Sequence, residues 1–456
     1  MEELKEGWRL ENLEENLEVI LDYRGKTPQK SEKGRVTLSA KSVKMGYIDY
    51  SNIYYVSEET YSKFMTRGFP KKGDILLTTE APLGCVAELK DDSVCLAQRL
   101  ITLRGKKEKL NNKYLLYYLQ SPRGQYELLS KATGTTVQGI KRTEFSKVKI
   151  LMPSLEKQNK IVSILSSIDE KIELNRKINQ NLEETAQTLF KRWFIDFEFP
   201  NEEGKPYKSS DGKLIESELG EIPEGWRVGK LGEIVEINPR ENLKKLEKKI
   251  YIEMKCLSET SSIISEYYER EFTGTGTKFK NKDTLMARIT PCLENRKIGY
   301  VNFLKDNDIG WGSTEFNILR SQNNIPRELS YFIARSKKFL DYAISNMNGS
   351  SGRQRVSGKT LEEYNIVISS ENIYKKFGKV SNTIMNQIEN NRKEIEKLIE
   401  LRDYLLPRLM SGEVNVSNLK ISGISNSDLS FYLIQFYHLK MIKLKLSFLA
   451  IVNYGF

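Results

Sequence analysis

The sequence is poor in the residues that most enzymes use to move protons or hold metals. Its 456 residues include one histidine, His438, and four cysteines. Because that histidine lies in the last twenty residues, we expect neither a Ser-His-Asp nor a Cys-His triad, and a single histidine excludes the zinc sites that need two. Long apolar runs are missing too, because no stretch of about 18 uncharged apolar residues occurs to cross a membrane. These absences favour a soluble chain without conventional catalytic machinery.

The cysteines show no C-x-x-C spacing, and the first twenty residues contain no apolar signal-like stretch. We therefore expect a cytoplasmic chain with reduced, buried thiols. Charge is what the sequence has in excess: 72 Lys and Arg stand against 61 Asp and Glu, for a net charge of +11. Such a surplus favours an anionic partner, and nucleic acid ahead of a membrane surface, because no long cationic amphipathic helix is present.

The sequence repeats itself once. Gly7-Trp8-Arg9 returns as Gly225-Trp226-Arg227, 218 residues later. The other matches, in order, are Asp74, Leu76 and Pro82 with Asp283, Leu285 and Pro291; Leu103-Arg104 with Leu319-Arg320; Leu115-x-Tyr117 with Leu329-x-Tyr331; Gly134-Thr135-Thr136 with Gly349-Ser350-Ser351; and Ile172-Glu173-x-Asn175-Arg176 with Ile388-Glu389-x-Asn391-Arg392. The offset varies between 209 and 218 and settles at 216, as expected when insertions fall in loops. The chain is two tandem copies of one unit.

Each copy is predicted to be a globular part with short strands, such as 74–78 and 316–319, followed by a long helix. Apolar or asparagine residues recur in both helices at alternating spacings of four and three, which is the pattern of a coiled-coil seam. The seam residues are Ile161, Leu165, Ile168, Ile172, Asn175, Asn179, Leu182 and Leu189 in the first helix, and Ile384, Ile388, Asn391, Ile395, Leu398 and Leu405 in the second. Packing into each domain's own core is the alternative, but residues 158 to 195 would span roughly 57 Å as a helix. We predict an intramolecular coiled-coil spacer.

The fold class is therefore α+β, with two tandem globular domains whose long helices pair as an antiparallel spacer. The predicted boundaries are 1–154 for the first domain, 155–197 for its helix, 198–220 for a linker, 221–370 for the second domain, 371–412 for its helix and 413–456 for a tail without counterpart in the first copy. The linker is rich in Gly, Pro, Ser and charge.

The sequence contains no recognisable catalytic or cofactor-binding motif. Asn238-Pro239-Arg240 lacks the second proline and the aromatic residue of a methyltransferase catalytic loop. Asp196 with Glu203 and Lys205 could be imagined as a magnesium-dependent nuclease site, but these residues lie in the predicted linker. No phosphate-binding G-x-x-x-x-G-K-[ST] loop occurs. We expect a chain that is not an enzyme by itself and holds no cofactor or metal.

Two basic, glycine-containing loops, 133–142 and 349–355, are suited to DNA, because Ser and Thr donate to phosphates while Gln and Arg contact base edges. An ordinary surface turn is the alternative for each. The candidates for DNA contact are Arg24, Lys26, Lys41, Lys44, Arg67, Thr135, Thr136, Gln138, Lys141 and Arg142 in the first copy, and Lys278, Lys280, Arg288, Arg296, Ser350, Ser351, Arg353, Gln354 and Arg355 in the second. Segments 24–72 and 240–281 differ most between the copies, so the copies are expected to read different sequences.

The arrangement resembles the specificity subunit of type I restriction-modification systems over about residues 1–413. The matching segments are Gly7-Trp8; Ile140-Lys141-Arg142 with Phe145 and Pro153; Gln158-x-x-Ile161-Val162; Leu189-Phe190-Lys191-x-Trp193-Phe194; Ile222-Pro223-Glu224-Gly225-Trp226; and the run from Leu405 to Glu413. Each is weak alone, but their order together with the repeat is specific.

The resemblance implies two target-recognition domains, each binding one half of a bipartite, asymmetric site in double-stranded DNA, with the helices setting the gap. It also implies two modification subunits, which use S-adenosylmethionine to methylate adenine, and restriction subunits, which use ATP and Mg²⁺. The tail 413–456 departs from the family, whose members usually stop near Glu413. A stand-alone DNA-modifying enzyme and a coiled-coil nucleic-acid-binding scaffold remain the alternatives.

Overall fold

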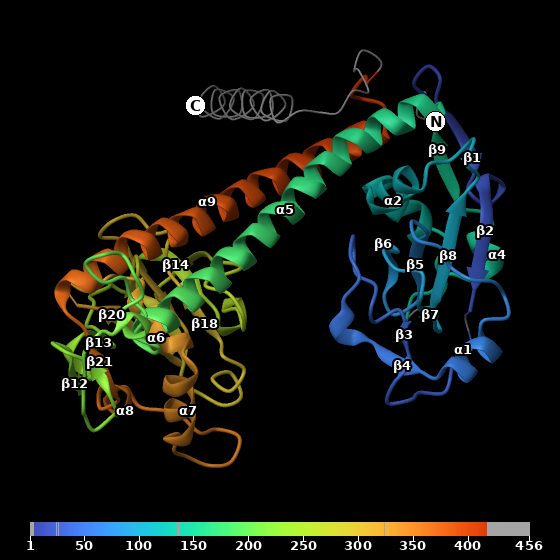
Figure 1. The fold of residues 1–456 in the computed structure, drawn as a ribbon. Coiled ribbons are helices and arrows are strands. Elements are labelled where there is room, and N and C mark those ends of the chain that lie inside the picture. Colours follow the sequence, from blue (N-terminus) through green and yellow to red (C-terminus); the bar gives the residue numbers. More distant parts are fainter. Residues whose placement is uncertain (1–3, 24, 26, 135–136, 323, 417–456) are drawn as a thin grey trace, which may run out of the picture. The chain divides into compact units, whose positions relative to one another are not determined.

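The computed structural model describes residues 4–23, 25, 27–134, 137–322 and 324–416. The described residues form two compact units (Figure 1): unit 1 contains those up to 171 together with 397–416, and unit 2 contains those within 172–396. Each unit therefore holds one globular domain and part of both long helices. In the described part, no helix is long and apolar enough to cross a membrane.

The domain of unit 1 contains three sheets. The largest has four antiparallel strands in the order β2-β8-β5-β6: Leu17–Asp22, Leu100–Gly105, Ile75–Thr79 and Leu83–Glu88. A smaller sheet has the order β4-β3-β7 (Tyr54–Val56, Arg35–Leu38, Cys95–Leu96), with β3 parallel to β7. Strand β1 (Arg9–Asn12) pairs with β9 (Lys149–Met152). Every residue of β5 is buried, as its unbroken run of apolar and β-branched side chains predicts.

The domain of unit 2 repeats this topology. Its four-stranded antiparallel sheet has the order β13-β20-β17-β18: Val235–Ile237, Phe316–Ser321, Thr284–Ala287 and Ile298–Tyr300. A second sheet has the order β15-β14-β19-β16 (Tyr268–Glu271, Lys248–Ile252, Ile309–Gly312, Thr277–Lys280), with β14 parallel to β19. Strand β12 (Arg227–Lys230) pairs with β21 (Asn365–Ile368), as β1 pairs with β9.

Short helices complete both domains. Unit 1 contains α1 (Glu58–Phe64), α2 (Asn112–Gln120), α3 (Pro122–Leu129) and α4 (Arg142–Phe145), and unit 2 contains α6 (Leu329–Arg335), α7 (Lys337–Ser345) and α8 (Gly358–Glu362). Helices α2, α3 and α4 correspond to α6, α7 and α8. Helix α1 and strand β16 have no counterpart, and they lie in segments 24–72 and 240–281, where the two copies differ most. The mixed α+β class is confirmed.

The two long helices are α5 (Leu155–Phe194) and α9 (Glu371–Met410), of 40 residues each. Ser154 precedes α5, and its hydroxyl accepts a hydrogen bond from the Lys157 N–H, as helix N-caps do. After α9, Gly412 adopts φ 73°, the left-handed conformation that commonly ends helices. A Cβ there would also lie 2.7 Å from the Trp8 ring, so only glycine fits.

The helices run antiparallel within each unit, because contacting residue numbers rise along one helix as they fall along the other. In unit 2, the Asn391 amide donates to the Asn179 side chain at 2.8 Å, and the Asn175 amide donates to Glu394 at 2.8 Å. In unit 1, Arg402 donates to Asp169 at 3.2 Å. The predicted seam residues are all buried or half-buried. Buried amides that satisfy each other fix the register of such a pair.

Both packing modes considered for the helices occur together in unit 2. Phe194 contacts Phe377 across the helix pair, with ring centroids 5.0 Å apart, while Phe190 stacks on Phe332 of α6 at 6.0 Å. The C-terminal turns of α5 therefore belong to the hydrophobic core of the second domain as well as to the seam.

The segment 198–220, predicted to be a linker, is more ordered than its composition indicates. It contains a short 3-10 helix (Lys208–Ser210) and strand β10 (Leu214–Ile215), which pairs with β11 (Ile222–Pro223). Phe199 stacks between Tyr207 and Trp226, with centroid distances of 4.6 and 4.9 Å. These aromatic contacts hold the segment against unit 2. The tail beyond Val416 lies outside the described residues.

The four thiols differ in burial. Burial raises the pKa of Cys95 to about 11 and also raises the pKa of Cys256. Cys85 and Cys292 are only half-buried, which corrects the expectation that all four thiols are buried. We predict that a thiol reagent at pH 8 modifies Cys85 and Cys292 in the native protein and reaches Cys95 and Cys256 only after unfolding. Mass spectrometry of the labelled peptides checks this, and labelling of native Cys95 would contradict it.

Candidate nucleic-acid interface

The frame of each domain contains a buried, bidentate ion pair. In the first copy, Arg104 Nε and Nη2 lie 2.6 and 2.7 Å from the two carboxylate oxygens of Asp74. In the second, Arg320 Nε and Nη2 each lie 2.7 Å from Asp283. These residues match in the sequence repeat, and both aspartates are almost fully buried. The pair joins a central strand, β8 or β20, to the turn that precedes β5 or β17.

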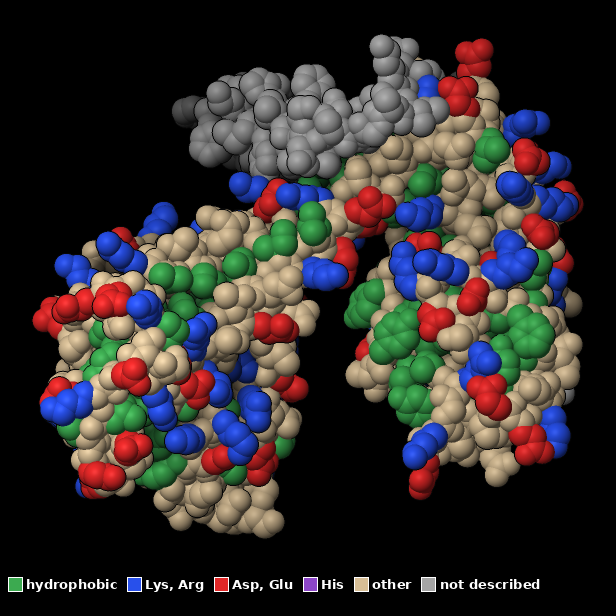
Figure 2. All heavy atoms as spheres, in the orientation of Figure 1, with side chains coloured by type: hydrophobic (Ala, Val, Ile, Leu, Met, Phe, Trp, Pro, Cys, Tyr) green, Lys and Arg blue, Asp and Glu red, His purple; other side chains and the backbone are tan. Residues whose placement is uncertain are grey.

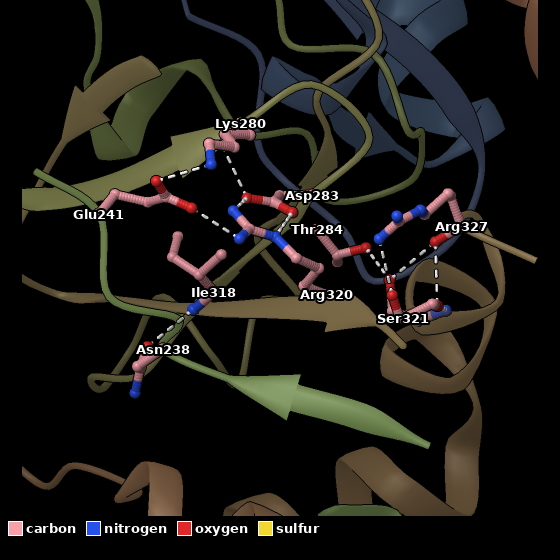
Figure 3. A network of polar contacts seen from close by, with 10 residues as sticks. Asn238, Glu241, Lys280, Asp283, Thr284, Ile318, Arg320, Ser321 and Arg327 are labelled. Atoms are coloured by element: carbon pink, nitrogen blue, oxygen red, sulfur yellow. Dashed lines mark hydrogen bonds and ion pairs between the residues drawn. The ribbon is translucent and has the colours of Figure 1, made fainter. Parts of the chain in front are cut away.

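The second copy extends this pair into a network (Figure 3). Arg320 also donates to Glu241 at 2.7 Å, and Glu241 accepts from Lys280 at 2.8 Å on its other side. Burial alone would raise the pKa of Glu241, but hydrogen bonds from Lys280 and Arg320 lower it below its usual range. Lys280 is thus part of the frame, which leaves it less suited to the DNA contact predicted for it.

Two loops of the second copy, 288–297 and 348–355, are joined by backbone pairing; we call them the arginine loops. Bridges link Arg355 to both Ile289 and Asn348, and the Val356 N–H donates to the Arg288 carbonyl at 2.9 Å. The Arg355 guanidinium holds Glu315 at 2.7 and 2.8 Å, which lowers the pKa of that carboxyl. Arg355 therefore connects the arginine loops to strand β20, which begins directly after Glu315.

The arginine loops present cations and hydroxyls. Arg296, Ser350, Ser351 and Arg353 are exposed, and Gln354 is half-buried. The Nε of Arg288 and the hydroxyl of nearby Thr290 are buried without a hydrogen-bond partner among the described residues. Arginine forks with free donors beside hydroxyls form a surface that can contact phosphates and base edges.

The first copy has the same loop framework with different side chains. Bridges link Gly139 to Glu80 and Thr133, and the Ile140 N–H donates to the Thr79 carbonyl at 2.9 Å. Gln138 and Lys141 are exposed there. Glu80 lies 3.5 Å from Arg99, whereas the ion pair of this region in the second copy joins Arg355 to Glu315. The two copies therefore offer different chemistry on one framework.

The loop glycines are explained by the turns themselves. Gly134 and Gly349 adopt φ 103° and 129°, which side chains rarely tolerate. A Cβ at Gly134 would lie 2.4 Å from the Val137 carbonyl oxygen. Close approach to a phosphate is not needed to account for either residue.

Several other candidates already have partners within the chain. Arg142 forms a bidentate ion pair with Glu14 and lowers the pKa of that carboxyl. The Arg67 guanidinium donates to the Asp22 carbonyl, and the Lys278 ammonium lies 5.2 Å from the Phe272 ring centre. Lys41 is exposed and Lys44 half-buried. Arg24, Lys26, Thr135 and Thr136 lie outside the described residues.

The two units differ in the surfaces that Figure 2 displays. Lys and Arg side chains gather along one side of unit 2, whereas apolar side chains are more prominent on the visible face of unit 1. Tyr47, Tyr50, Tyr55 and Phe69, all in the first copy, are exposed large aromatic residues.

Sequence reasoning missed two arginines of unit 2. Arg270, exposed on edge strand β15, stacks over Tyr251, 4.8 Å from its ring centre. Arg335 is buried at the end of α6, whose other residues are apolar or small except for Tyr331. For Arg335, the available signal is a single arginine at the end of a helix of apolar and small residues. Arg270 lies in a charged strand, so the sequence gives no signal for it.

Comparisons with known proteins agree on one family. A model of the type I restriction modification DNA specificity domain matches the chain twice, over residues 5–184 and 223–400. The type I restriction enzyme MjaIX specificity subunit of Methanocaldococcus jannaschii is 29% identical over 379 residues, covering 80% of this chain and 82% of the relative. The MjaVIII specificity subunit of the same organism is 25% identical over 392 residues, covering 82% and 88%. The crystal structure of the S subunit of a type I restriction-modification system from M. genitalium shares the fold, with a TM-score of 0.53, 18% identity and coverage of 90% of this chain and 97% of that one.

Proposed function

Because the chain belongs to the family of type I restriction modification DNA specificity domains, of which it contains two copies, we propose that it recognises a bipartite, asymmetric site in double-stranded DNA. Each domain binds one half-site, and the antiparallel helices α5 and α9 set the gap between them. The observation that carries the proposal is one loop framework, repeated with the same bridges in both domains, that presents different side chains in each. Different side chains on one framework suit two different half-sites.

In this proposal, other subunits catalyse the reactions on DNA. The chain acts in the cytoplasm and is not catalytic by itself. It directs two modification subunits, which carry S-adenosylmethionine and methylate adenine, and restriction subunits, which require ATP and Mg²⁺. The exposed apolar side chains of Leu174 and Ile178, one turn apart on α5, suit a helical partner: they are 52% and 36% exposed. We assign the modification subunits to this face of the spacer.

Modified-base sequencing of DNA from cells that contain the chain and its modification subunits tests the proposal. We expect one motif with two unlike half-sites, a fixed unread gap and a methylated adenine in each half. A continuous motif without a gap, or methylation by the purified chain alone, would refute it. Equal affinity for every duplex, even with modification subunits present, would favour the scaffold alternative.

Replacing Arg296 and Arg353 with alanine is predicted to weaken binding to the second half-site. Both side chains are exposed on the arginine loops, and each bidentate contact to a base edge contributes about 1–3 kcal/mol. Titration of labelled duplexes by the complex at fixed salt measures the effect. Lys205→Ala, which removes an exposed lysine paired with Glu203, is the control and should change affinity little. If the double variant binds a duplex with an intact second half-site as tightly as the control does, the arginine loops do not read DNA.

A further inference from the structure

Arg335 is a buried cation that no carboxylate contacts directly among the described residues. It is 9% exposed, at the end of α6. Its guanidinium donates to five backbone carbonyl oxygens: three within 258–261, at 2.6 to 3.2 Å, and those of Arg296 and Ile298, at 3.2 and 3.1 Å. A planar fork with five donors can reach carbonyls on two separate segments, whereas the compact ammonium of a lysine has three donors and a shorter reach. Arg335 therefore fastens two separate backbone segments to one point.

The remaining bond of Arg335 leads to the long helix α5. Arg335 Nε donates to the Tyr331 hydroxyl at 3.1 Å, and that hydroxyl donates to Glu183 Oε1 at 2.5 Å. The other oxygen of Glu183 accepts from the Ser262 N–H at 3.0 Å. Tyr331 is fully buried, and burial raises its pKa far above the usual range, so it keeps its proton at neutral pH. The Glu183 carboxylate thus balances the charge of Arg335 through the Tyr331 hydroxyl, which lies between them.

These contacts connect α5 to the arginine loops. Arg296 belongs to loop 288–297, and Ile298 begins β18 directly after it. The same loop is bridged to loop 348–355 through Ile289 and Arg355. A continuous set of hydrogen bonds therefore runs from Glu183 on the helix to the backbone that carries the exposed arginines.

The first copy contains only the beginning of this arrangement. Tyr117 matches Tyr331 in the repeat, and its hydroxyl donates to Asp169 on α5 at 2.8 Å. Four residues further, where the second copy has Arg335, the first has Ser121, whose hydroxyl donates to the Tyr118 carbonyl of α2 and accepts from the Gly124 N–H of α3. The tyrosine–carboxylate contact occurs in both domains, whereas, among the described residues, the connection to the loops is seen in the second domain.

We propose that Arg335 is a positioning residue for DNA recognition by the second domain, and that it acts with Tyr331 and Glu183 to set the arginine loops from helix α5. The inference rests on the proposed function. It implies that recognition of the second half-site depends on the spacer helix through these three side chains, while recognition of the first does not.

Tyr331→Phe tests this with the smallest change, because it removes only the hydroxyl between Arg335 and Glu183. The complex with modification subunits is titrated with three duplexes: the intact site, one with the first half scrambled and one with the second half scrambled. We expect discrimination at the second half-site to fall about tenfold, as for a lost hydrogen bond to a charged group, and discrimination at the first to stay unchanged. Arg335→Lys should resemble Tyr331→Phe, since an ammonium cannot span both segments.

Tyr117→Phe is the matched control and should leave discrimination at the second half-site intact. Thermal unfolding of each variant establishes that it is folded; if Arg335→Lys is not, Tyr331→Phe decides. Unchanged discrimination in folded Tyr331→Phe, or an equal loss at both half-sites, would overturn the inference. Failure of the wild-type complex to discriminate either half would instead overturn the proposed function, so the two outcomes are separable.

Discussion

Replacing Asp283 with asparagine is expected to lower the free energy of unfolding of unit 2 by about 1.5–3 kcal/mol, as for lost hydrogen bonds to a charged group, because Arg320 keeps Glu241 as a partner. Asp283 is almost fully buried and receives both donors of the Arg320 fork. Asparagine keeps the shape but removes the charge and presents an N–H₂ to one of those donors. Denaturant unfolding followed by tryptophan fluorescence measures the change, since Trp193, Trp226 and Trp311 all lie in unit 2.

Two further variants test whether the loss of stability comes from the buried ion pair or from the change in net charge. Asp341→Asn removes one member of an exposed pair with Lys337 in the same unit, 2.6 Å apart, and should leave unfolding unchanged. Asp283→Leu combined with Arg320→Met removes both buried charges, leaves Glu241 with Lys280, and should recover much of the loss. If Asp283→Asn unfolds at the same denaturant concentration as Asp341→Asn, the pair does not support the frame.

Inserting one heptad into both long helices is expected to lengthen the unread gap in the DNA site by about three base pairs, because seven helical residues add about 10.5 Å. The insertions belong after Lys171 and after Glu396, where the units divide. A matched pair keeps the seam continuous in both units, including the Asn179–Asn391 amide pair. Modified-base sequencing then compares the gap of the variant with that of the parent.

An insertion in α5 alone is the control. The seam residues on one side of it can no longer face their partners in α9, so we expect recognition to be lost rather than shifted. A parental gap after the matched insertion would show that the helices do not set the spacing. Retained recognition after the single insertion would show that their register is unimportant.

The sequence predicted the domain organisation and the long helices better than the side-chain contacts within them. The matches around Trp8 and Trp226 established the repeat, and the family resemblance drawn from them is confirmed by the two matched domains. The spacing of the seam residues predicted two long helices, which are observed as α5 and α9. Periodicity and repetition report the burial of many residues at once, and this is why they succeed.

Contacts between side chains that lie far apart in the sequence could not be predicted from periodicity or repetition. Asp74 and Arg104 were found as separate repeat matches, but only the pairing of β5 with β8 brings them together. The ion pair of Arg142 with Glu14 could not be predicted, because the two residues lie 128 positions apart in the sequence. The aromatic packing of Phe199 could not be predicted either, because segment 198–220 has no periodic pattern of apolar residues.

The pairing of β1 with β9, and of β12 with β21, brings the entrance and exit of each domain together. Arg9 lies opposite Met152, and Arg227 lies opposite Ile368. A domain whose two ends meet at one strand pair can be exchanged as a cassette, because a replacement needs to match only that junction and the helix surface beneath it. New pairs of half-sites can thus arise by recombination between genes, with the spacer helices inherited unchanged.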